Sequence, residues 1–298
     1  MKTRTLGNTG LRVSRLGLGL AEIGLELVLK REDEAIRVLN EALDAGITFL
    51  DTASCYGDSE VLIGRAVAHR RDEFVLATKV GHPNSGHSGA LWTAELITDG
   101  IERSLKRLKT DHLDLIQLHS CCLKVLEQGD VIRALLDAKQ AGKTRYVGYS
   151  GDNEAARWAV ESGYFDTLQT SYNLVDQRAR VDLFPEARTR GLGIIAKRPI
   201  ANAAWGYGNG ASSLYRQRVR AMAEMGPIPR APEDPILLAL GFTLAHDAVD
   251  TAIVGTKNPE HVHANVELVE HRLPIPAEVV TELQHRYDEL FNDWRQQE

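Results

Sequence analysis

Short apolar segments alternate with longer amphipathic segments along almost the whole chain, and this alternation limits the fold more than any other feature. It is typical of a parallel sheet whose strands are joined by helical crossovers. Eight segments have the length and composition of strands: Leu16–Leu18, Thr48–Asp51, Phe74–Lys79, Leu113–His119, Tyr146–Ser150, Thr167–Tyr172, Gly193–Arg198 and Thr251–Val254. Eight strands with crossovers can close on themselves, so we predict an α/β fold of the (β/α)₈ TIM-barrel class.

Two segments flank the expected barrel. A turn at Gly7–Gly10 separates two short apolar stretches and predicts a small N-terminal β-hairpin, and an extra C-terminal helix is expected from Pro276 to about Trp294. Residues 1–298 are expected to form a single domain. The stretch Pro199–Pro232 shows no regular pattern and is expected to be irregular.

Three helix starts carry specific signals. Thr93 precedes an amphipathic run, and a threonine hydroxyl can accept a hydrogen bond from the first turn of a helix. Asp234-Pro235 and Asn258-Pro259 each combine an N-cap residue with a proline at the first helical position. We therefore expect helices to begin at these three points.

Composition excludes several classes of protein. The net charge of −6 argues against general nucleic-acid binding, which needs a basic face. The three cysteines include the neighbours Cys121 and Cys122 and suggest no disulfide framework, so a reducing, cytoplasmic location is expected. The longest apolar run, Ile236–Ala245, is too short to span a bilayer, and we expect no membrane partner. Nothing in the sequence specifies an oligomeric state.

Polar residues end three neighbouring strands of the expected barrel. Asp51 ends the second strand, Lys79 the third and His119 the fourth, and Tyr56 lies in the loop after the second. Active sites of such barrels lie at the carboxyl ends of the strands. A single polar strand end is more often an incidental cap, but four that converge favour a catalytic site.

This set suits proton transfer to a carbonyl oxygen. A phenol with a pKa of ~10 is a weak acid at neutral pH, and a nearby ammonium group lowers such a pKa. We expect Lys79 to do this for Tyr56, with Asp51 holding Lys79 in place and His119 orienting a carbonyl oxygen. Tyr56 would then act as a general acid.

Spaced motifs identify the family that the chain resembles. Asp51-Thr52-Ala53, Tyr56-Gly57, Thr78-Lys79 and Gln117-Leu118-His119 occur in the order found in aldo-keto reductases, and the similarity runs from about residue 3 to about residue 268. The resemblance implies a catalytic tetrad at Asp51, Tyr56, Lys79 and His119. It also implies NADPH, with NADH possible, bound across the barrel mouth, and an aldehyde, ketone or corresponding alcohol as small-molecule substrate.

The resemblance assigns cofactor contacts as well. Ser150 and Gln169 match positions that hold the nicotinamide carboxamide, and Asn265 matches one that holds the adenine. Gly255-Thr256-Lys257 resembles the loop that meets the adenosine phosphate, where Lys257 could pair with a 2′-phosphate.

Three positions depart from the family pattern. Gly151 replaces a frequent asparagine, and Lys197-Arg198 replace a tyrosine and serine of which the tyrosine stacks on the nicotinamide ring. His261 stands where relatives that prefer NADP often have arginine. Lys197 could contact the cofactor pyrophosphate, and it could equally be a solvated lysine at a strand end.

Other binding motifs and functions are weighed against the reductase hypothesis. A Rossmann fingerprint is incomplete because Glu22 occupies its third glycine position, and no histidine or cysteine spacing suits a metal. Trp92, Trp205 and Tyr207 lie in expected loops at the barrel mouth and could line a substrate pocket. A redox sensor or regulatory subunit with little turnover is the main alternative. A lyase or hydrolase that uses Lys79 as a Schiff-base amine is a third possibility, disfavoured by the adjacent Asp51.

Overall fold

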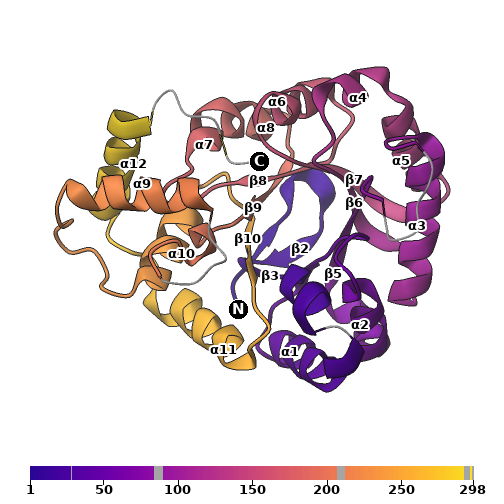
Figure 1. The fold of residues 1–298 in the computed structure, drawn as a ribbon, viewed down its shortest axis with the longest axis horizontal. Helices are drawn as coiled ribbons and strands as arrows, with labels where there is room; N and C mark the ends of the chain where they lie inside the picture. Colours follow the sequence, from indigo (N-terminus) through magenta and orange to yellow (C-terminus); the bar gives the residue numbers. More distant parts are fainter. Residues whose placement is uncertain (28, 84–89, 207–211, 292–295, 297–298) are drawn as a thin grey trace.

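The computed structural model describes residues 1–27, 29–83, 90–206, 212–291 and 296. Within this part of the chain, eight parallel strands close into a barrel in the order β10-β3-β4-β5-β6-β7-β8-β9, and helices surround it (Figure 1). The strands are β3 (Leu16–Gly19), β4 (Phe49–Asp51), β5 (Val75–Val80), β6 (Leu113–His119), β7 (Thr144–Ser150), β8 (Thr167–Ser171), β9 (Gly193–Lys197) and β10 (Thr251–Gly255). The predicted (β/α)₈ fold is confirmed.

The surrounding helices follow the strands in sequence. They are α1 (Glu32–Asp44), α2 (Ser59–Ala66), α3 (Ala94–Leu108), α4 (Leu123–Gln128), α5 (Asp130–Gln140), α6 (Asn153–Ser162), α7 (Arg178–Asp182), α8 (Phe184–Thr189), α9 (Ser213–Glu224), α10 (Pro235–Ala245), α11 (Pro259–Glu267) and α12 (Ala277–Phe291). The side chains of Thr93, Asp234 and Asn258 accept hydrogen bonds from the first turns of α3, α10 and α11, so the three predicted caps are confirmed. Helix α12 is the expected extra C-terminal helix, and Trp294 lies outside the described residues.

One expectation was wrong. The stretch predicted to be irregular contains α9, whose N-cap Ser212 accepts a hydrogen bond from Tyr215 N. The buried face of this helix consists of Tyr215, Arg218 and Met222. Because Arg218 is charged yet almost fully buried, the helix lacks the apolar stripe by which it could be predicted.

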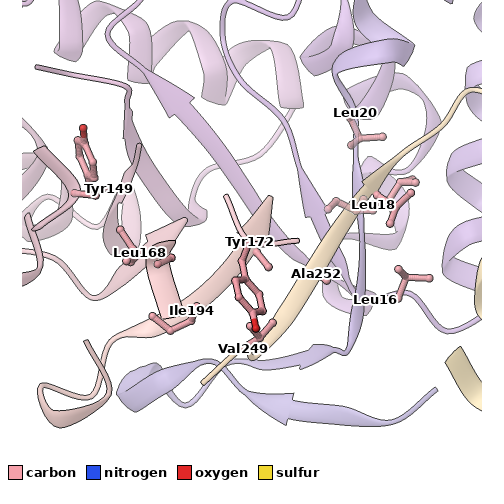
Figure 2. Close-up of a cluster of buried hydrophobic side chains, with 14 of the residues drawn as sticks. Leu16, Leu18, Leu20, Tyr149, Leu168, Tyr172, Ile194, Val249 and Ala252 are labelled. Atoms are coloured by element: carbon pink, nitrogen blue, oxygen red, sulfur yellow. The ribbon is translucent and has the colours of Figure 1, made fainter. Parts of the chain in front are cut away.

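Successive side chains of each strand point to opposite sides of the barrel wall, and this divides the core into two layers. One layer packs between the strands and the helices, and Figure 2 shows part of it, including Leu16 and Leu18 of β3 and Ala252 of β10. The other fills the barrel itself, where Phe49, Val75, Ala77, Leu115, Ile195 and Ile253 pack together. The barrel interior is therefore a closed apolar core beneath the mouth.

The N-terminal hairpin, β1 (Thr3–Thr5) paired with β2 (Arg12–Ser14), closes the floor of this core. Its apolar residues Leu6, Leu11 and Val13 belong to the same interior cluster. The buried Asp250 joins the hairpin to the barrel, because its Oδ2 accepts hydrogen bonds from Gly7 N at 3.0 Å and from Ile194 N at 2.9 Å. The predicted hairpin thus forms a structural plug at the end opposite the site.

No helix in the described ranges is long and apolar enough to cross a membrane.

Replacing Asp250 with alanine should lower the free energy of unfolding by about 2–4 kcal/mol, because the buried Ile194 amide, the partly buried Gly7 amide and the nearby Arg4 and Arg188 lose their acceptor. Urea denaturation of the purified proteins measures this. The exposed neighbour Asp247→Ala is the control and should change stability by less than ~0.5 kcal/mol. Equal stability of both variants would show that Asp250 does not hold the floor.

Candidate active site

Strand parity brings the predicted catalytic residues to one place. Phe49, Val75 and Leu115 point into the barrel, so Asp51, Lys79 and His119, at even spacings further along the same strands, lie on the same face at the mouth. Ser150 and Lys197 end β7 and β9, and Gln169 lies two residues before the end of β8. Six strands therefore supply polar groups, at or near their carboxyl ends, to one opening.

A buried ion pair forms the base of the site. Lys79 Nζ lies 2.6 Å from Asp51 Oδ2 and also donates to the carbonyl oxygen of Thr52 at 2.9 Å. Gln169 Nε2 donates to the same carboxylate at 3.3 Å. Burial acts to lower the pKa of Lys79, but Asp51, Tyr56 and Cys55 together outweigh it, so the pKa is raised and the amine stays an ammonium ion. Burial raises the pKa of Asp51, and Lys79 opposes this.

Tyr56 lies over this pair, with Lys79 Nζ 5.3 Å from the centre of its ring. Lys79 acts to lower the pKa of the phenol, as expected, but it does not set the net direction of the shift. Burial raises the pKa of Tyr56, and Lys79 offsets only part of the effect. Tyr56 is therefore protonated at neutral pH and can donate a proton.

His119 forms the opposite wall. Its ring meets Tyr56 edge-on, with centroids 5.6 Å apart, and the His82 ring packs edge-on against the His119 ring with centroids 4.8 Å apart. Burial and then the positive charge of Lys79 hold the pKa of His119 well below its ordinary value, so the ring is neutral. Cys55 Sγ lies 3.5 Å from Nδ1, and burial raises the pKa of this thiol, which argues against a reactive thiolate.

A cavity of about 690 Å³ extends from these four residues across the mouth of the barrel. It is lined by all four of them and by Ser150, Gln169, Lys197, Gly255 and His261 among others. Of the other residues predicted to contact cofactor or substrate, Lys257, Asn265, Trp92 and Trp205 are not part of its described lining. Trp92 packs edge-on against His82 with centroids 5.5 Å apart, Trp205 is half-buried, and Tyr207 lies outside the described residues.

A chain of amides links the expected carboxamide site to the ion pair. Gln117 Nε2 donates to Gln169 Oε1 at 2.7 Å, which directs the Gln169 amide nitrogen toward Asp51. Ser150 is buried beside it and lines the same cavity. The orientation of Gln169 is thus set by residues on two other strands.

The departure at Gly151 has a steric cause. A Cβ at this position would lie 2.4 Å from Tyr149 Oη and 2.6 Å from the tyrosine ring. Tyr149 is fixed there because its hydroxyl donates to the carbonyl oxygen of Cys121 at 2.7 Å. The asparagine that many relatives carry cannot fit beside this tyrosine.

Lys197 is not a solvated lysine. Its ammonium group lies 2.8 Å from the buried Asp152 Oδ2, and its side chain is only 15% exposed. Asp152 also accepts hydrogen bonds from Thr170 Oγ1 and Ser171 N. Although burial opposes it, Lys197 and these donors hold the pKa of Asp152 below its ordinary value. Lys197 therefore remains at the cavity wall as the partner of a fixed carboxylate.

The end of the cavity away from the tetrad lies at the loop after β10. Thr256 Oγ1 contacts His261 Nδ1 at 3.2 Å, and the exposed Lys257 forms an ion pair with Glu26. Asn265 is half-buried on α11. Glu26 and Glu22 reach this end from the segment after β3.

Sequence reasoning missed three residues of this region. Asp152 directly precedes α6, a position that suggests an N-cap, yet its carboxylate points to Lys197 and makes no capping hydrogen bond. Glu22 and Glu26 follow a strand end, which is the one signal in the sequence that could have placed them at the mouth.

Residues 15–287 match the model of the Aldo/keto reductase family. L-galactose dehydrogenase of Arabidopsis thaliana is 28% identical over 301 residues, covering 90% of this chain and 88% of that protein. Pyridoxal 4-dehydrogenase of Microbacterium luteolum is 28% identical over 327 residues, covering 91% of this chain and 94% of that protein. An aldo-keto reductase of Bacillus halodurans in its holo form superposes with a TM-score of 0.82 at 30% identity, covering 96% of each chain.

Gly151→Asn should lower the free energy of unfolding by about 1–3 kcal/mol, because the new side chain collides with the fixed Tyr149 ring. Thermal or urea denaturation measures the loss. Gly142→Asn is the control, since no atom lies within 4 Å of a Cβ there and asparagine tolerates its left-handed backbone. In a Tyr149→Ala background the added cost of Gly151→Asn should be much smaller; equal costs in both backgrounds would refute the steric explanation.

Proposed function

Since this chain belongs to the Aldo/keto reductase family and is an NAD(P)H-dependent oxidoreductase, we propose that it interconverts a small aldehyde or ketone and its alcohol with Tyr56 as the general acid or base. The observation that carries the proposal is the meeting of a protonated phenol, a buried ammonium group and a neutral imidazole at one end of a cavity. No group in this set is a good nucleophile, and each has a role in moving a proton to oxygen.

The cavity fits a nicotinamide cofactor. Its volume of about 690 Å³ lies within the range of pockets that bind molecules of this size. Gly19 and Gly255 face each other in its wall, and a Cβ at Gly19 would lie 3.5 Å from Gly255 N, so the wall has no side chain at this point. When bound, the cofactor supplies or accepts the hydride.

The proposed catalytic roles follow from charge and position. Tyr56 gives its phenolic proton to the carbonyl oxygen during reduction and takes it back during oxidation. Lys79 stabilises the tyrosinate that remains, and Asp51 keeps Lys79 charged and in place. Neutral His119 donates a hydrogen bond that orients the carbonyl oxygen.

Cofactor contacts are proposed for the residues along the cavity. Ser150 and Gln169 would hold the carboxamide, and Lys197, kept in place by Asp152, would lie near the ring or the pyrophosphate. Gly255, Lys257, His261 and Asn265 would surround the adenosine end. The family resemblance favours NADPH over NADH, and that preference depends on the charges around Lys257.

The substrate is proposed to enter over Tyr56 and His119. Trp92 is connected to His119 through His82, so it could line the outer part of this entrance, and Trp205 lies after the turn that follows β9. Two relatives are named for a sugar and for pyridoxal, both small polar molecules. A small polar carbonyl compound is therefore the proposed substrate class.

Tyr56→Phe should reduce kcat for carbonyl reduction by about 10²- to 10⁴-fold, because it removes the proton donor and leaves the cavity otherwise intact. Cofactor binding, followed by tryptophan fluorescence, should stay nearly unchanged. Tyr164→Phe controls for the loss of one hydroxyl, because this tyrosine is 49% exposed and is not among the described residues that line the cavity. Turnover of Tyr56→Phe near that of the unmodified enzyme would refute the proton-donor role.

A further inference from the structure

The adenosine end of the cavity carries more negative charge than a site for a 2′-phosphate should. Glu22 and Glu26 both line it, and they face Gly255, Thr256 and His261 across the opening. Both glutamates come from the segment after β3, which includes the helical turn Ile23–Leu27. This acidic pair is not among the residues that the family resemblance assigns to the cofactor.

Lys257, the residue expected to bind a 2′-phosphate, is already engaged. Its ammonium group forms an ion pair with the Glu26 carboxylate, and both side chains are about half exposed. A phosphate would have to displace Glu26 from Lys257 or share the lysine with it. Either arrangement puts a phosphate dianion next to a carboxylate.

Glu22 adds a second carboxylate nearer the cavity wall. Its Oε1 would lie 3.3 Å from a Cβ at Gly255, so the carboxyl group rests against the start of the adenosine loop. Burial and then the charge of Glu26 raise the pKa of Glu22, whereas Lys257 and His261 lower it. These four groups are therefore close enough to affect one another's charge, and the two carboxylates outnumber the single ammonium group of Lys257.

We propose that Glu22 and Glu26 determine the cofactor preference, disfavouring the 2′-phosphate of NADPH and favouring NADH. Carboxylates accept hydrogen bonds from a ribose 2′-hydroxyl in NAD-binding sites, whereas a nearby cation accommodates the 2′-phosphate in NADP-binding sites. In this chain the nearby cation is Lys257, and its charge is already neutralised by the ion pair with Glu26. The proposal rests on the proposed function, because it needs the cofactor to occupy this cavity.

Equilibrium binding tests this without turnover. NADH and NADPH are titrated against the full chain by fluorescence, and 5′-AMP and 2′,5′-ADP by calorimetry, because the second pair differs only in the 2′-phosphate. The variants are Glu26→Gln, Glu22→Gln and Lys257→Met. Glu73→Gln, an exposed glutamate paired with Arg70, removes the same charge outside the cavity and is the control.

The unmodified protein should bind NADH more tightly than NADPH. Glu26→Gln should tighten NADPH and 2′,5′-ADP binding by about tenfold, which corresponds to ~1.4 kcal/mol, and change NADH binding by less than about threefold. Glu22→Gln should act in the same direction, and Glu73→Gln should change neither. Because Glu26 acts through Lys257, its effect should be much smaller in the Lys257→Met background.

Two results would overturn the proposal in distinguishable ways. If both dinucleotides bind but the unmodified protein prefers NADPH, or if Glu26→Gln leaves the preference unchanged, the acidic pair does not select the cofactor and the proposed reductase function stands. If neither dinucleotide binds, the proposed function fails and the cofactor preference fails with it.

Discussion

The buried pair of Asp51 and Lys79 is the interaction on which the rest of the site depends. Each charge is almost completely removed from water, and an isolated ion in such a place would cost several kcal/mol. The pair is tolerated because Thr52 and Gln169 supply further hydrogen bonds and the pair spans the ends of two adjacent strands. A positive charge is thereby fixed beneath Tyr56, while a neutral His119 is maintained beside it. Replacing either ion alone would leave the other buried without a counter-charge.

The departures from the family pattern at the mouth have local partners in the structure. Gly151 leaves room for the Tyr149 ring, and Lys197 forms an ion pair with the buried Asp152. His261, the third departure, contacts Thr256 Oγ1. The apolar barrel interior and its hairpin floor are separate from these pairs.

Much of this arrangement was predictable from the sequence because it follows from period-two strands. Apolar runs mark the strands. Because alternate residues of a strand lie on the same face, residue spacing alone directs Asp51, Lys79 and His119 into the same opening. Features that depend on contacts between distant segments were not predictable. Lys257 and Glu26 are 231 positions apart, and helix α9 was missed because a buried arginine breaks its apolar face. The effect of Lys79 on the pKa of Tyr56 has the expected sign, but the larger opposing effect of burial was missed, because the degree of burial cannot be read from residue spacing.

The central claim is that burial, set against Lys79, keeps Tyr56 protonated beside a neutral imidazole. The pH dependence of kcat/KM for carbonyl reduction tests it most directly. A general acid must be protonated, so the rate falls as pH rises through its pKa. With the pKa of Tyr56 raised and that of His119 lowered, the rate should be level through neutral pH and fall only above the ordinary tyrosine value of ~10. A fall centred below pH ~9 would mean that Lys79 dominates over burial, and would contradict this account of the site.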